Sequence, residues 1–131
     1  MAIAWGSPVG GIQIGASVAP ARGTFVQIVI SIKNGSNQPL HLVRTAPLAD
    51  YKIAVTDSSG SLVPISPSGQ LQTTSSVGNA HFRRILVVLP VNKTRQERYD
   101  LTSLFDLKPG SYKVVVTMGA ASSAPAPFVI T

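Results

Sequence analysis

Apolar and polar residues alternate with a period of two along much of this chain, a pattern that predicts β-strands. Two early segments, residues 12–18 and 26–32, are expected to be joined by a turn over residues 20–23. Their apolar positions are Ile12, Ile14, Ala16 and Val18, then Val26, Ile28, Ile30 and Ile32. Because alternate side chains of a strand point to one face, each segment is expected to bury one face in a core.

The middle of the chain repeats this pattern between turn sequences. The reversal at 34–37 is expected to use a positive φ at Gly35, and a further strand follows it. The strand at 51–56 ends in an Asp-Ser-Ser-Gly turn over 57–60. This arrangement predicts a hairpin with residues 62–63.

The next region combines a loop with two strands. Proline, glycine and hydroxyl residues in 64–80 predict a long exposed loop. The apolar strand 82–91 is expected to pair as a hairpin with the polar strand 94–101. Asp100 is expected to cap one helical turn over 101–105.

The last long strand is preceded by a recognisable turn. In Leu-x-Pro-Gly-x-Tyr, Leu107, Pro109, Gly110 and Tyr112 have the pattern of a tyrosine corner. Inward positions then follow at Tyr112, Val114, Val116 and Met118, with a final strand at 128–130 after a linker over 119–126. The sequence therefore predicts one all-β domain over residues 1–131, an immunoglobulin-like antiparallel β-sandwich of seven to nine strands.

Composition supports this class. The 131 residues are 44% hydrophobic and only 12% charged, with 11 glycines and 10 prolines, which favours strands and turns over helices. Without cysteine, no disulfide or cysteine-based metal site can form. The net charge of +6 makes polyanions or acidic proteins possible partners. Nucleic acid is an unlikely partner, because the aromatic residues occupy apolar strand positions.

Neither uncharged end segment is expected to be a leader or a membrane span. Residues 1–21 lack a basic n-region and are interrupted by glycine and proline, so they do not resemble a signal peptide. Residues 114–131 contain Gly119, Pro125 and Pro127, which interrupt a membrane helix.

Catalytic and metal-binding patterns are missing from the sequence. The only histidines are His41 and His81, and no Gly-x-Ser-x-Gly elbow is present. The five acidic residues are dispersed, with Asp57 expected in a turn and Asp100 as a cap. We therefore expect a non-enzymatic protein without metal or cofactor.

One concentrated polar feature remains. The predicted hairpin about Asn92 and Lys93 would gather a basic strip of His81, Arg83, Arg84, Lys93, Arg95 and Arg98. Such a strip either solvates an edge strand or binds an acidic partner with a strong salt dependence.

The single tryptophan, Trp5, precedes the first long strand. It is expected to plug one end of the core, because large aromatic side chains contribute most where they are buried. The alternative is an assembly contact, in which an apolar end segment adds a strand to a neighbouring sheet edge.

The order of these motifs, residues 32–40, then 51–60, then 107–112, resembles small bacterial immunoglobulin-like domains. These include the intracellular proteinase inhibitor (BsuPI-like) family. The opening residues 5–12 also resemble bacterial sandwich domains that are often secreted, which favours an extracellular or periplasmic location. Two functions are thus expected: protein-protein interaction or surface assembly, and alternatively proteinase inhibition through the 64–80 loop.

Overall fold

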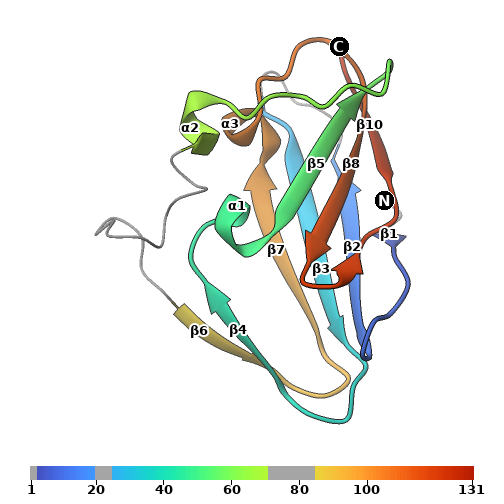
Figure 1. Cartoon of the computed structure of the whole chain (residues 1–131), viewed down its shortest axis with the longest axis vertical. Helices are drawn as coiled ribbons and strands as arrows, with labels where there is room; N and C mark the ends of the chain where they lie inside the picture. The colour runs from blue at the N-terminus through green and yellow to red at the C-terminus, as the bar shows by residue number, and fades with distance from the viewer. Residues whose placement is uncertain (1–2, 20–24, 71–84) are drawn as a thin grey trace.

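The computed structural model describes residues 3–19, 25–70 and 85–131, and it is mostly β with antiparallel sheets (Figure 1). The strands of the described residues are β1 (Ala4–Trp5), β2 (Ile12–Val18), β3 (Gln27–Asn34), β4 (Leu40–Arg44), β5 (Lys52–Asp57), β6 (Ile85–Leu89), β7 (Thr94–Asp100), β8 (Gly110–Met118), β9 (Ala121–Ser122) and β10 (Ala126–Ile130). The helices are α1 (Pro47–Asp50), α2 (Pro67–Gln70) and α3 (Leu101–Leu104). The strand number exceeds the predicted seven to nine because β1 and β9 have only two residues each.

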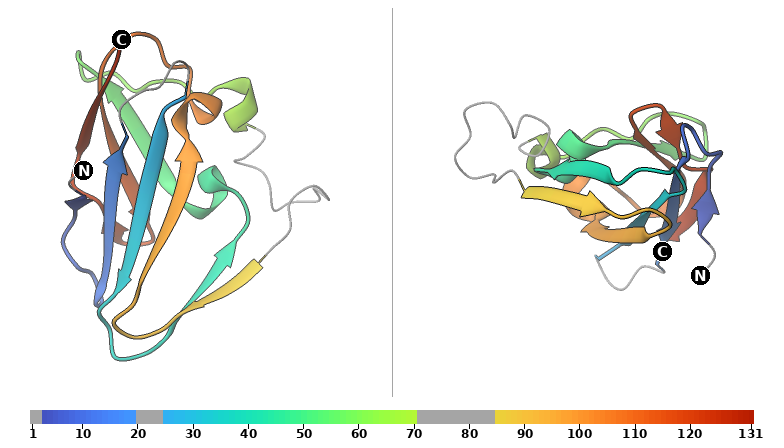
Figure 2. Two further views of the ribbon diagram at one scale, coloured as in Figure 1. Left: turned by 180° about the vertical axis from the view of Figure 1, so that it is seen from behind. Right: turned by 90° about the horizontal axis from the view of Figure 1, so that it is seen from below.

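Two sheets face each other across the core, and a third, smaller one lies beside them. The first sheet has the order β1-β2-β3-β7, and the second has β10-β8-β5 with β9 paired to β8. Strands β4 and β6 form a separate two-stranded sheet at one side of the molecule (Figures 1 and 2). All named strand pairs are antiparallel.

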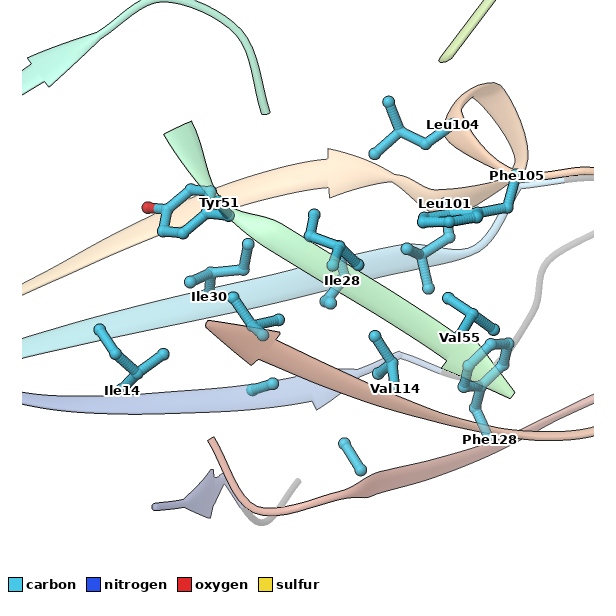
Figure 3. Close-up of a cluster of buried hydrophobic side chains, with 14 of the residues drawn as sticks. Ile14, Ile28, Ile30, Tyr51, Val55, Leu101, Leu104, Phe105, Val114 and Phe128 are labelled. Carbon is cyan, nitrogen blue, oxygen red and sulfur yellow. The ribbon is translucent and has the colours of Figure 1, made fainter. Parts of the chain in front are cut away.

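The predicted alternation of apolar and polar residues identifies the side chains that form the core. Ile28, Ile30 and Ile32 of β3 are fully buried, as are Val114 and Val116 of β8. Side chains from both sheets meet between the layers, as the close-up in Figure 3 shows. Period-two alternation thus identified the core-facing side of the long strands, although the opposite side of β2 is covered as well, at Gly15 and Ser17.

The hairpin expected between residues 82–91 and 94–101 is wrong. Strand β6 pairs with β4, whereas β7 pairs with β3 over the seven positions from Gln27–Asp100 to Lys33–Thr94. The buried amide of Asn34 lies between the separating chains. Its side-chain Nδ2 donates to the carbonyl oxygen of Leu89 at 3.0 Å, while the backbone carbonyl oxygen of Asn34 accepts from the backbone amide of Asn92 at 2.8 Å. Asn34 therefore satisfies backbone groups on both sides of the point where β6 and β7 diverge, one through its side chain and one through its backbone.

Other turns also differ from the expectation. Gly35 does not adopt a positive φ, and a positive φ occurs instead at Asn92 (61°) and Gly60 (84°). The hairpin arm at residues 62–63 is reduced to a single bridge between Leu62 and Thr56. The linker over 119–126 contains β9.

The loop expected over 64–80 is helical in its described part. Residues 67–70 form α2, and Gly69 lies so close to α3 that a Cβ there would be 2.2 Å from the carbonyl oxygen of Leu104. The hydroxyl of Ser66 also donates to the carbonyl oxygen of Ser103 at 2.8 Å. Residues 64–70 are therefore packed against α3, and residues 71–80 lie outside the described residues, as does the turn at 20–23.

The approach to β8 contains the predicted Asp100 cap and a contact between the Tyr112 side chain and the backbone. Asp100 caps α3, its side chain accepting from the amide of Thr102 at 3.0 Å. The hydroxyl of Tyr112 donates to the carbonyl oxygen of Lys108 at 2.5 Å and accepts from the Lys108 amide at 3.1 Å. With helices of only four residues, the described chain contains no helical segment suited to crossing a membrane.

Candidate interaction surface

The two-stranded sheet of β4 and β6, hereafter the ribbon, presents an apolar outer face. Its register pairs His41 with Val88 and Val43 with Leu86. The exposed fractions are 52% for Val43, 65% for Leu86 and 49% for Val88. These neighbouring side chains therefore form an exposed apolar patch.

The inner face of the ribbon is apolar as well. Leu42 and Leu89 are each 4% exposed and belong to the main core, and Leu40 and Val87 pack against it from partly buried positions. An antiparallel sheet that covers a core on one side normally alternates apolar with polar residues. The ribbon departs from that pattern, so packing among the described residues does not explain its outer face.

The ribbon also has free edges within the described residues. Strands β4 and β6 are paired only with each other there. Natural edge strands usually carry lysine, proline or a bulge that prevents pairing with another chain. Here proline occurs only outside the strands, as Pro39 and Pro90, and no lysine lies within either.

A buried cluster of charges anchors the base of the ribbon. Arg44, the last residue of β4, contacts Glu97 of β7 at 3.0 Å and Asp50 of α1 at 4.0 Å. Arg95 donates to the other Glu97 oxygen at 3.1 Å, and the Tyr51 hydroxyl donates to Glu97 as well. Since these groups belong to the ribbon, to α1 with its C-cap Tyr51, and to the first sheet, the cluster ties the ribbon and α1 to the first sheet.

Burial and the neighbouring positive charges shift the pKa values of the two carboxyl groups in the cluster in opposite directions. Burial raises the pKa of Glu97, but the Tyr51 hydroxyl and the Arg44 and Arg95 guanidiniums outweigh it and hold that pKa below its ordinary value. Burial dominates at Asp50 and raises its pKa, despite the Thr45 amide and Arg44. Glu97 is therefore the carboxylate that balances the buried guanidinium of Arg44.

The sequence did not reveal this cluster. Its acidic residues were expected to be dispersed, yet Asp50 and Glu97 both face Arg44. The sequence signal that could have revealed the cluster was the position of Glu97 in its strand, because Glu97 shares a face with Tyr99 two residues later. A charged residue on the inward face of a strand requires a buried partner.

The predicted basic strip is not assembled on one face of the described residues. His81, Arg83 and Arg84 lie outside those residues. Lys93 occupies the turn before β7, and Arg95 and Arg98 point to opposite faces of β7 because they are three residues apart. Arg95 is engaged with Glu97, whereas Arg98 is exposed.

Trp5 does not plug the core as predicted. It pairs with Gly15, and a Cβ on Gly15 would lie 2.8 Å from Trp5 Cε3 and 2.5 Å from Cγ2 of Ile3. Gly15 points away from the core, since its neighbours Ile14 and Ala16 are fully buried. The indole therefore covers the outer face of β2, beside a groove of about 650 Å³ formed with residues 6–9 and 120–124.

The described part of the chain contains no group of three histidine or acidic side chains placed to hold a metal. His41 is exposed on the ribbon, and a second concavity of about 530 Å³ lies over β5, β8 and β10, lined by residues such as Thr56, Lys113 and Val129. The exposed apolar outer face of the ribbon is thus the surface feature that packing among the described residues explains least.

Comparison with known proteins adds no relative: no protein-family model matches the sequence, and no curated protein matches it.

Proposed function

We propose that this chain is a non-enzymatic, immunoglobulin-like module for protein-protein interaction, and that the ribbon is its contact surface. The observation that carries the proposal is the outer face of Val43, Leu86 and Val88 beside His41, apolar and exposed on a sheet with free edges in the described residues. Apolar area of this kind gains free energy when a partner covers it. An unpaired edge adds backbone hydrogen bonds to that gain.

Two features support the immunoglobulin-like part of the proposal. Antiparallel sheets lie in two layers around the core, and the Tyr112 hydroxyl is bound to the backbone of Lys108 four residues earlier. A tyrosine hydroxyl bonded to backbone upstream of its own strand is the defining contact of a tyrosine corner.

The ribbon supports interaction better than residues 64–70, the described part of the 64–80 loop, support proteinase inhibition. An inhibitory loop is an extended segment presented to a protease cleft, whereas residues 64–70 fold against α3. The anchored ribbon, in contrast, is preorganised by the charges at its base.

A peptide-display selection on the immobilised protein tests this proposal. The variant pair Val43→Thr and Val88→Thr keeps the β-branched shape of both side chains but makes the outer face polar. Val129→Thr on β10, where Val129 is 57% exposed, is the matched control.

Selected peptides are expected to bind the wild type and the Val129→Thr control alike, and to bind the ribbon double variant at least about tenfold more weakly. Peptides whose affinity is unchanged by the ribbon substitutions would refute the ribbon as the contact surface. A selection that enriches no binding peptides would also refute the ribbon as the contact surface.

A further inference from the structure

Exposed acidic residues are distributed unevenly between the two ends of the molecule. Asp57 ends β5, Asp100 ends β7, and Asp106 follows α3, so these three acidic residues lie at the end that carries α2 and α3 (Figure 1). The opposite end, where the ribbon meets the turns after β3 and β6, carries Lys33 and Lys93. The remaining acidic residues, Asp50 and Glu97, are in the buried cluster.

The cluster does not compensate the lysines at the ribbon end. It joins two guanidiniums, of Arg44 and Arg95, to two carboxylates, and is neutral as a unit. Neither Lys33 nor Lys93 forms an ion pair within the described residues, and both are exposed. The free charge at this end is therefore positive.

The lysines are physically connected to the ribbon. The amide of Asn34, next to Lys33, donates to the carbonyl oxygen of Lys93 at 3.0 Å. The Asn34 side chain donates in turn to Leu89, the last residue of β6. Positive charge thus lies where the apolar outer face and the free edge of β6 end.

From this arrangement we infer that the partner of the ribbon is an extended protein segment in which apolar residues alternate with aspartate or glutamate. This inference rests on the proposed function. The segment adds as a strand to the β6 edge, its apolar residues extend the face of Leu86 and Val88, and its carboxylates lie near the lysines. A second copy of this chain is a poor occupant, because it would bring the same lysines together at a net charge of +6 per chain.

Fluorescence anisotropy with three labelled probes tests the inference. The probes are an eight-residue peptide alternating glutamate with valine, the same peptide with lysine in place of glutamate, and an eight-nucleotide oligothymidylate. Lys33→Glu with Lys93→Glu reverses the charge at the ribbon end. Lys52→Glu with Lys113→Glu, on the outer faces of β5 and β8, removes the same amount of charge elsewhere and is the matched control.

The glutamate peptide is expected to bind at least about tenfold more tightly than the lysine peptide, and to lose about fivefold in affinity between 50 and 300 mM salt. Its binding is expected to fall about tenfold in the Lys33 and Lys93 variant, to fall similarly with Val43→Thr and Val88→Thr, and to change less than twofold in the control.

Three outcomes would overturn the inference. Equal binding of both peptides, lost on the ribbon substitutions, would leave the interaction module in place and refute the acidic partner. Tight binding of the oligothymidylate, unaffected by the ribbon substitutions, would show that the positive charge binds a polyanion and not an acidic protein segment. Binding of neither peptide at millimolar concentration would refute the acidic segment, while the display selection would still decide whether the ribbon is a contact surface.

Discussion

Replacing Glu97 by glutamine is expected to destabilise the fold strongly, because Glu97 balances two guanidiniums and accepts from Tyr51. Its side chain is only 8% exposed, and that of Arg44 is 11% exposed. Glutamine keeps the shape but removes the negative charge, so Arg44 stays buried with only Asp50, at 4.0 Å, as a counterion.

The magnitude follows from the burial of these groups. Breaking a buried pair by removing one partner costs about 3–5 kcal/mol. The Arg95 contact adds little, because that side chain is 36% exposed and partly screened by solvent. We therefore expect a loss of about 3 kcal/mol, a large share of the roughly 5–15 kcal/mol that stabilises a typical domain.

Urea unfolding at pH 7, followed by circular dichroism, measures this loss. The midpoint is expected to fall by roughly 1–2 M in Glu97→Gln at an unchanged m-value. The control Asp106→Asn, which removes an exposed carboxylate, is expected to stay within about 0.5 kcal/mol of the wild type. A loss below about 1 kcal/mol for Glu97→Gln would refute the view that this carboxylate balances the ribbon anchor.

The pH dependence gives an independent check. Because the pKa of Glu97 is lowered by folding, its contribution is complete above its ordinary value of 4.5 and is lost as the pH falls through the folded-state value. The stability difference between the wild type and Glu97→Gln is therefore expected to be constant near neutrality and to shrink below pH 4.5. A difference that persists unchanged at pH 2 would show that the glutamine acts through packing alone.

Three further substitutions test separate contacts. Tyr112→Phe removes the hydroxyl bonds to the Lys108 backbone and is expected to cost about 1 kcal/mol by urea unfolding; no loss would mean that these two bonds contribute nothing to stability. Asn34→Ala leaves the Leu89 carbonyl without its side-chain donor and is expected to cost about 2–3 kcal/mol, with faster amide exchange in β6; protection equal to the wild type would contradict that role. Gly15→Ala places a Cβ against the indole of the single tryptophan and is expected to shift its fluorescence to longer wavelength, whereas an unchanged spectrum would place the indole elsewhere.

Local sequence patterns predicted the strands and their buried faces well. Residues 12–18, 26–32 and 112–118 alternate so regularly that only one face of each can enter a core, and the structure buries that face. Asp100 was identified as a cap and Asp57 as a turn residue, since both act on backbone amides within four positions. These features depend on residues that are close together in the sequence, so they can be predicted from the sequence alone.

The candidate surface could not be predicted in the same way. The apolar residues of β4 and β6 are evident in the sequence, but strand pairing decides which of them face outward, and the expected hairpin with β7 was wrong. The charged cluster likewise joins Arg44 to Glu97, 53 positions apart, where the ribbon meets the first sheet.

The sequence by itself determined the all-β class and the inward face of each long strand, because these depend on side-chain alternation and local backbone preference. Only the tertiary structure decided which strands pair, which acidic residues are buried, and which apolar face remains open. Those outcomes depend on contacts between segments far apart in the chain, where several pairings would satisfy the same local pattern and long-range packing selects among them.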